Sequence, residues 1–320
     1  MKTAWIAALA LAAAGSAYAQ GSYPTRPVSM VVGFAPGGGT DTVARIVAKN
    51  LSESLGQQVL VENKAGAGGN IATEFVARAV PDGYTILLGS VGSLAVAPHV
   101  IANLPYDPLR DFAPITMAVV FANVLVVQPA LSAQSLAEFV KLAKDKPGSV
   151  NYGSAGILSA GHLAGELLNI RANIDMVHVP YKGGGPAMQG ILGGQIMSIF
   201  ATPVSVAAHM KAGKLRALAT TGPKRAALLP DVPTVAESGY PGYEAMNWYA
   251  YLAPAKTPKE IIARLNRDLV KALNNAEVAV LLHQQGLEPS PGSAAELARY
   301  MEREYETWGK VVKQAGIRAQ

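Results

Sequence analysis

The fold is decided by residues 28–55, VSMVVGFAPGGGTDTVARIVAKNLSESL. The β-branched and aliphatic run from Val28 to Phe34 predicts a buried strand. From Thr40 to Leu55 apolar residues recur at helical spacing and predict an amphipathic helix; the residues on its apolar face are Val43, Val47, Leu51 and Leu55. A strand, a glycine-rich turn and a helix in this order begin a unit in which the helix crosses over a parallel sheet.

The same alternation continues along the chain. Further strands are predicted at residues 59–62, 85–88, 124–127, 176–179, 196–200 and 215–219. Helices are predicted to begin at Ile71, Leu136, Ser159, Pro186 and Pro203, and at about residues 258, 277 and 294 in a mostly helical last third. Ser135, Thr257 and Ser293, each followed by Glu three residues later, fit capping boxes. This pattern predicts an α/β class with mostly parallel sheets flanked by helices.

The length favours two domains. A chain of 320 residues, half of them apolar, is long for one ordinary core. Turn-rich segments lie at residues 121–123 and 221–233, with a run of alternating elements between them. We predict a first domain of residues 22–124 plus 226–320 and a second of residues 125–225. The two connecting segments, residues 121–125 and 221–228, would then serve as one hinge. Periodicity favours two α/β units without proving that the chain crosses twice.

The N-terminus predicts export. Lys2 precedes an apolar run from Trp5 to Ala14, and Ala17-Tyr-Ala19 fits a cleavage site. This order is typical of a secretory signal peptide, here residues 1–19. The alternative is a buried N-terminal helix. Export favours a protein that captures, cuts or builds something outside the cytoplasm. The sequence contains no Cys, so an exported chain must fold without disulfides.

Composition and motifs argue against several other classes. The net charge of +5 is spread along the chain without a basic run, so no nucleic-acid partner is predicted. No segment after Gln20 resembles a membrane span. Gly213-Lys214 is followed by Leu215, which breaks the nucleotide-binding pattern, and the dinucleotide pattern also fails in register. We therefore predict no cofactor.

Catalytic and metal-binding patterns are also lacking. The nucleophile pattern Gly-x-Ser-x-Gly and the zinc pattern His-Glu-x-x-His do not occur. His162 and Glu166 share a helix face, but two ligands do not make a metal site. We predict neither a metal nor an enzyme; an exported hydrolase of another type is the alternative.

Glycine-rich loops carry the best chemical signal. Four of them precede predicted helices, at residues 34–41, 65–70, 152–162 and 181–186. Such a loop exposes backbone amides at a helix N-terminus, where the helix dipole attracts anions. A single one is more often a plain turn. Four in one exported chain favour ligand binding.

Nine motifs together give a family resemblance. They are Tyr23-Pro-x-Arg-Pro27, Phe34-Ala-Pro-Gly-Gly-Gly-Thr-Asp41, Val61-Glu-Asn-Lys-Ala-Gly-Ala-Gly-Gly-Asn70, Pro81-Asp-Gly-Tyr84, Asp111-Phe-Ala-Pro114, Asn151-Tyr-Gly-Ser154, His178-Val-Pro-Tyr-Lys-Gly-Gly-Gly-Pro186, Asp231-Val-Pro-Thr234 and Leu252-Ala-x-Pro-x-x-Thr-Pro258. With these motifs the chain resembles the Bug-type (TctC-like) periplasmic receptors of tripartite tricarboxylate transporters over essentially its whole mature length.

The resemblance implies a two-domain periplasmic-binding-protein (Venus-flytrap) fold with an organic acid held by its carboxylate in the interdomain cleft. It implies a monomer with a small-molecule organic acid and the membrane components of such a transporter as partners. A ligand sensor for a signalling partner is the alternative. The ligand-binding residues that it implies, with Trp248 added as an apolar wall, are Phe34, Gly38, Gly39, Thr40, Asp41, Ser90, Val91, Gly92, Ser154, Gly156, Ile157, Leu158, Ser159, His162, Ala201, Thr202, Pro203 and Trp248.

Two departures from the family pattern bear on the ligand. Leu158 stands where relatives usually have Gly, and Ala201 where they often have Asp. Bulk at Ile157 and Leu158, with Phe34, Phe121 and Trp248 as walls, favours a carboxylate with an apolar or aromatic body. Without an acid at Ala201, an α-amino group is not expected. The alternative is that Ile157 and Leu158 only pack against the following helix.

Overall fold

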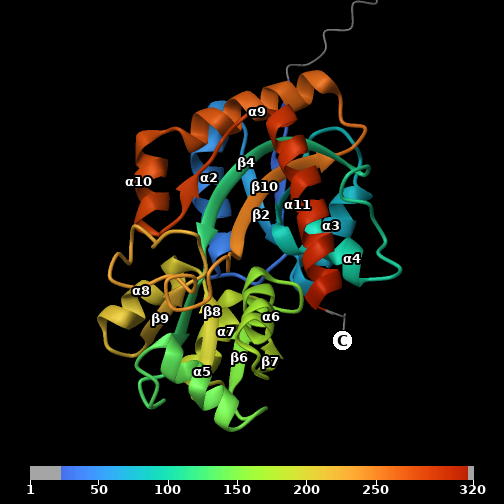
Figure 1. Ribbon diagram of the computed structural model, residues 1–320. Helices are drawn as coiled ribbons and strands as arrows, with labels where there is room; N and C mark the ends of the chain where they lie inside the picture. Colours follow the sequence, from blue (N-terminus) through green and yellow to red (C-terminus); the bar gives the residue numbers. More distant parts are fainter. Residues whose placement is uncertain (1–22, 316–320) are drawn as a thin grey trace, which may run out of the picture.

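The computed structural model describes residues 23–315, so the predicted signal peptide lies outside the described residues. The chain forms two sheets, drawn one above the other in Figure 1. In order, the elements are β1 (Val28–Val32), α2 (Gly39–Leu55), β2 (Val59–Asn63), η2 (Ala67–Gly69), α3 (Asn70–Ala77), β3 (Thr85–Ser90), η3 (Gly92–Val96), α4 (Ala97–Val100), β4 (Phe112–Ala122), β5 (Val124–Val127), α5 (Leu136–Asp145), β6 (Asn151–Ser154), α6 (Ala160–Ala172), β7 (Val177–Pro180), α7 (Gly184–Leu192), β8 (Ser198–Ala201), α8 (Pro203–Lys211), β9 (Arg216–Thr220), β10 (Met246–Pro254), α9 (Lys259–Leu273), α10 (Ala276–Gln284), β11 (Glu288–Pro289) and α11 (Ala294–Ala315).

The first sheet has the strand order β11-β4-β10-β3-β1-β2. Because side chains alternate along a strand, β1 faces two cores. Met30 packs with residues of α2, α9 and α10, whereas Val31 packs with residues of α3, η3 and α11. The predicted apolar face of α2 is confirmed, since all four of its residues are buried in the first of these cores. Gly56, with a φ of 68°, ends the helix.

The second sheet has the order β7-β6-β8-β5-β9. Like the first sheet, it has helices packed on both faces. Leu125 and Val127 pack with α5 and α6, whereas Val124 and Val126 pack with α7 and α8. Each sheet therefore separates two apolar layers, which is the arrangement that the α/β pattern predicts.

The α/β class is confirmed, but the sheets are mixed rather than mostly parallel. β1 pairs in parallel with β2 and β3, and β6 with β7 and β8. Every pairing of β4, β5 and β10 is antiparallel. The sequence prediction missed β4, β6, β10 and the two-residue β11. Both faces of β10 are buried, so it lacks the alternation that marks a strand, and Pro114 interrupts the apolar run of β4.

Helix starts follow their capping residues in two of the three predicted cases. The hydroxyls of Ser135 and Ser293 accept the amide N–H groups of Glu138 and Glu296. The prediction at Thr257 is wrong, because α9 begins one residue later, after Pro258, and the Thr257 hydroxyl caps nothing. Within residues 23–315, no helix combines the length and the apolar composition that a membrane crossing requires.

Two crossings between the sheets lie side by side. β4 continues into β5 through Asn123, and β10 starts at Met246 beside the end of β4. Thr221 joins both crossings: its amide donates to the Asn123 carbonyl, and its carbonyl accepts from the Ala245 amide, each at 2.9 Å. Its hydroxyl donates to the Ala245 carbonyl at 2.8 Å and accepts from the Asn123 amide at 2.9 Å. The two connections are therefore tied together at one point.

Packing favours a later second crossing than the predicted one. Val235, Tyr243 and Ala245 lie in the core of the second sheet, against α5 and α6, although the predicted boundary assigns them to the first domain. Met246 then pairs with Ala122 of the first sheet. We propose that the second domain spans about residues 124–245, with the return connection at 245–246 rather than at 221–228.

Candidate functional site

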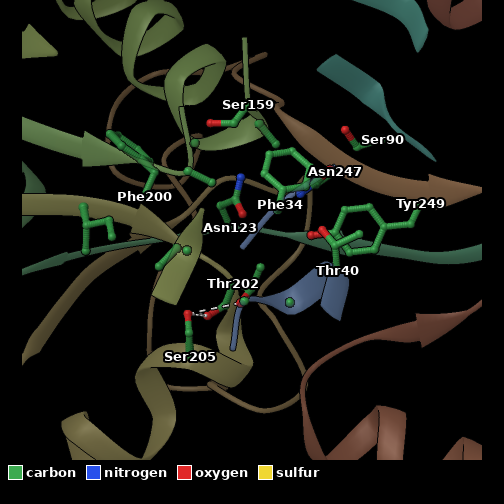
Figure 2. Close-up of a pocket in the computed structure, with 18 residues that line it drawn as sticks. Phe34, Thr40, Ser90, Asn123, Ser159, Phe200, Thr202, Ser205, Asn247 and Tyr249 are labelled. Atoms are coloured by element: carbon green, nitrogen blue, oxygen red, sulfur yellow. Dashed lines mark hydrogen bonds between the residues drawn. The ribbon is translucent and has the colours of Figure 1, made fainter. Parts of the chain in front are cut away.

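A cavity lies between the two sheets, close to both crossings (Figure 2). Strand ends and helix starts of both units form its wall. The residues that line it are Phe34, Gly38, Gly39, Thr40, Ser90, Asn123, Ala155, Ser159, Ala160, Gly161, Gly184, Ile199, Phe200, Ala201, Thr202, Ser205, Asn247 and Tyr249.

Four helices begin at this cavity. They start at Gly39 (α2), Ala160 (α6), Gly184 (α7) and Pro203 (α8), and each supplies lining residues from its first turn or from the residue before it. In none of the four does a side chain of the N-cap residue cap the helix. Each helix N-terminus carries about half a positive charge and leaves amide N–H groups without partners. Their convergence makes the cavity suited to an anion.

Polar side-chain atoms without partners face the same cavity. The residues described include seven buried polar side-chain atoms that lack a hydrogen bond, and four of them belong to lining residues. These are Ser90 Oγ, Asn123 Nδ2, Ser159 Oγ and Asn247 Oδ1. A buried polar group that stays unpaired costs about 1–3 kcal/mol, so each of these four favours a ligand or water that pairs it.

The lining is electrically neutral apart from the helix ends. Among the described residues that form the wall, none has a charged side chain. Burial raises the pKa of Tyr249 to about 12, with hydrogen bonding to Thr40 and Asn247 acting in the opposite direction. Its phenol is therefore neutral and can donate a hydrogen bond at pH 7.

Asp41 shapes the first glycine loop instead of lining the cavity. Its Oδ2 accepts from the Gly37 amide at 3.1 Å and from Arg45 Nε at 3.0 Å, and its Oδ1 accepts from Asn63 Nδ2 at 3.0 Å. Burial acts to raise the pKa of this carboxyl, but the hydrogen bonds from Arg45, Asn63 and Gly37 outweigh it and lower the pKa. An ionised Asp41 thus holds the loop that presents Gly38 to the cavity.

The two units touch each other around the cavity. The Ala35 amide donates to the Lys182 carbonyl at 3.1 Å, which joins the first glycine loop to the fourth. A Cβ added to Gly92 would lie 2.1 Å from the carbonyl oxygen of Leu158, in the third loop. Contacts this close leave no open cleft, so the structure shows the closed form.

The structure brings eight of the predicted ligand-binding residues to the cavity wall: Phe34, Gly38, Gly39, Thr40, Ser90, Ser159, Ala201 and Thr202. The other ten lie elsewhere: Asp41, Val91, Gly92, Ser154, Gly156, Ile157, Leu158, His162, Pro203 and Trp248. Gly156 and Ile157 line a second cavity, which shares Phe34 with the first.

Ser154, at the end of β6, and His162, in the first turn of α6, belong to a buried cluster with His178 of β7. Ser154 Oγ lies 2.6 Å from Nε2 of His178 and also contacts the Gly156 backbone. The rings of His162 and His178 stack with their centroids 4.2 Å apart, and His162 Nδ1 accepts the Leu158 amide N–H at 3.1 Å. These side chains organise the loop before α6, which carries Ser159, and they do not line the cavity.

The predicted apolar walls Trp248 and Phe121 are core residues. The Trp248 ring is fully buried under α11, where its N–H donates to Glu304 Oε2 at 2.8 Å. Phe121 packs edge-on against Tyr249 in the opposite core layer. Alternation along β10 turns Trp248 away from the cavity. Phe121 pairs with Asn247 and lies on the same face as Tyr249, but it is not among the residues that line the cavity. The aromatic wall is formed instead by Phe34, Phe200 and Tyr249.

Sequence reasoning missed Asn123 and Asn247, which the crossing strands place in the cavity wall. Each stands in an otherwise apolar stretch, FANVL at 121–125 and AMNWY at 245–249. A polar residue inside a buried apolar strand is unusual without a partner, and that signal could have identified both. Phe200, Ser205 and Tyr249 gave no comparable signal.

The buried histidines predict a loss of stability in acid. Burial lowers the pKa of His162 to about 4, and burial together with the charge of His162 lowers that of His178 to about 3. In the unfolded chain a histidine titrates near 6.5. Between pH 6.5 and 4 the unfolded state therefore binds more protons than the folded state. The free energy of unfolding should decrease as the pH is lowered through this range.

Urea denaturation at stepped pH measures this effect. In His162→Asn the side-chain oxygen can accept the Leu158 amide without titrating, so the variant should lack part of the slope between pH 6.5 and 4. Identical slopes for the variant and the wild type would contradict the assignment.

Comparisons with known proteins agree with this geometry. A sequence family described as the tripartite tricarboxylate transporter family receptor matches residues 43–317. The periplasmic binding protein BugD has a similar structure, with a TM-score of 0.90 and 36% identity over 93% of this chain and 100% of that one.

Two similar structures contain organic acids. Rpa4515 of Rhodopseudomonas palustris, solved with adipate, is 37% identical with a TM-score of 0.89, over 92% of this chain and 99% of that one. MatC of the same organism, solved with bound malate, is 33% identical with a TM-score of 0.87, over 91% and 100%. These matches extend over both sheets, and the matching sequence family is described as a receptor family.

Proposed function

The chain belongs to the tripartite tricarboxylate transporter receptor family, and we propose that it is a periplasmic receptor that binds an organic carboxylate in the cavity between its sheets and delivers it to the membrane components of such a transporter. One observation carries the proposal: four helix N-termini and four unpaired polar atoms surround a single cavity with an uncharged lining. Helix N-termini bind anions through free amides and the helix dipole.

The affinity needed for a receptor is within reach of these groups. Hydrogen bonds to a charged carboxylate contribute about 1.5–3 kcal/mol each. Three or four of them, less the cost of association and closure, suffice for micromolar binding at about −8 kcal/mol. An arginine side chain is not required.

We further propose that the ligand has an apolar body and no α-amino group. Phe34, Ile199 and Phe200 give the cavity an apolar side, and Ala201 adds no charge. The described wall offers no carboxylate to an ammonium group. The acids found in the two solved relatives, adipate and malate, also lack an amino group. These walls replace Ile157, Leu158 and Trp248 as the basis for the apolar body.

A thermal-shift screen followed by calorimetry tests the proposal on the chain without residues 1–19. Binding to the folded state must raise its apparent melting temperature. The panel compares benzoate, phthalate and dicarboxylates such as adipate with aspartate, glutamate and citrate. At least one apolar acid should bind with a Kd in the micromolar range and reduce the radius of gyration in solution scattering. Tighter binding of an amino acid or citrate would overturn the ligand type, and no binding of any acid would overturn the receptor.

Ser159→Ala should reduce the affinity for the acid about ten- to hundredfold. The substitution removes one of the unpaired hydroxyl groups at the cavity and leaves its partner on the ligand without a hydrogen bond. Thr220→Val is the matched control. The Thr220 hydroxyl is also buried and unpaired, yet it does not line the cavity. Calorimetry should give a wild-type Kd for the Thr220 variant. Equal affinities for both variants would remove Ser159 from the site.

A further inference from the structure

Leu158 belongs to the loop between β6 and α6, but its side chain packs into the core of the first sheet. It is 1% exposed, and the apolar cluster that it joins includes Val91, Leu94 and Trp248 of the first-sheet unit. Leu163, one turn into α6, joins the same cluster. Opening the cleft moves one unit away from the other, so this burial depends on closure.

Local hydrogen bonds hold Leu158 in an unusual conformation. Its φ is 63°, in the left-handed region that leucine rarely adopts. Its amide donates to His162 Nδ1, and the Ser159 amide donates to the Gly156 carbonyl, each at 3.1 Å. All of these groups lie in the second-sheet unit. The loop can therefore present Leu158 without help from the unit that receives it, and strain maintained at a contact point is typical of a functional segment.

The first-sheet unit is shaped to receive this loop. A Cβ added to Gly92 would lie 2.1 Å from the Leu158 carbonyl oxygen, and one added to Gly68 would lie 2.0 Å from the Ile157 carbonyl oxygen. Only glycine at both places lets the two backbones approach this closely. Side-chain insertion and backbone contact thus occur together at the same loop.

We propose that Leu158 is a closing latch, a positioning residue that touches no ligand and stabilises the closed form by burying its side chain in the first-sheet core. Given the proposed function, ligand enters and leaves through the open form. The latch then slows release and has little effect on association. The latch also raises the fraction of ligand-free protein that is closed. This effect can be measured without knowing the ligand.

Two measurements test the latch. Because the sequence has no Cys, cysteines placed at the exposed positions Glu53 on α2 and Gln189 on α7 can carry spin labels that report the distance between the units. Stopped-flow kinetics with adipate as probe give the association and dissociation rate constants. The variants are Leu158→Gly, which removes the side chain at a φ that glycine favours, and Leu158→Met, which keeps an apolar side chain.

Asn173→Gly is the matched control, since Asn173 also has a left-handed φ, of 50°, but lies at the far end of α6. Leu158→Gly should raise the dissociation rate constant by about tenfold or more, with the association rate constant within about threefold of wild type. It should also shift the ligand-free distances to longer values. Leu158→Met and the control should resemble wild type. Unchanged ligand-free distances for Leu158→Gly overturn the latch. If adipate does not bind the wild type, an acid of the panel that does bind replaces it as probe. Failure of every acid counts against the proposed function, and the distances alone then decide the latch.

Discussion

Gly92→Ala should weaken ligand binding at least about a hundredfold, equivalent to about 2.7 kcal/mol, while the ligand-free protein keeps its melting temperature. The added Cβ would lie 2.1 Å from the Leu158 carbonyl oxygen. That oxygen belongs to backbone held by local hydrogen bonds, so it cannot move aside without disturbing the loop before α6. The variant is therefore blocked in a more open form, in which the groups from the two sheets cannot surround one ligand.

The substitution separates closure from folding. Gly92 does not have a positive φ, so alanine fits its local conformation. Gly193→Ala is the control: its added Cβ would meet only the carbonyl oxygens of Gln189 and Gly190, in the same helix. Calorimetry should give a wild-type Kd for the control. A Gly92 variant that binds within threefold of wild type would show that the contact with Leu158 is not needed for binding.

Ala201→Asp should reduce the affinity for simple carboxylic acids about a hundredfold or more at pH 7. Ala201 lines the cavity, one residue before Thr202, the N-cap of α8. Two negative charges about 5 Å apart repel by about 3 kcal/mol at an effective dielectric constant of about 20. The introduced carboxylate also offsets the partial positive charge at the N-terminus of α8, which otherwise attracts the ligand anion.

The uncharged variant Ala201→Asn has nearly the same size and isolates the charge. It should bind the same acids within about tenfold of wild type, whereas amino acids should gain affinity only in the Asp variant, through their ammonium group. Competition calorimetry with one apolar acid and one amino acid distinguishes the two. An equal loss of affinity for the apolar acid in both variants would assign the effect to the size of the side chain. It would then give no support for a negatively charged ligand group near Ala201.

Much of the fold could be predicted from the sequence because it depends on local signals. Residues 28–55 specify a strand, a turn and a helix through the spacing of their apolar residues, and the structure has them as β1 and α2. Four glycine-rich loops precede predicted helices, and in the structure all four lead into a helix, namely α2, α3, α6 and α7. β10 was missed because burial on both faces removes alternation, and β4 because Pro114 interrupts its apolar run.

The candidate site shows the same division. The sequence by itself determined which loops could meet an anion, because glycines and helix starts are local features, and Phe34 and Ser159 do line the cavity. Only the tertiary structure decided which side chains face it. Asn123 and Asn247 come together because the chain crosses twice at one point, and Leu158 packs in the opposite unit because that unit leaves an apolar site beside Gly92. The direction of a side chain depends on strand register and on contacts between residues far apart in the chain, and periodicity along a single segment contains neither.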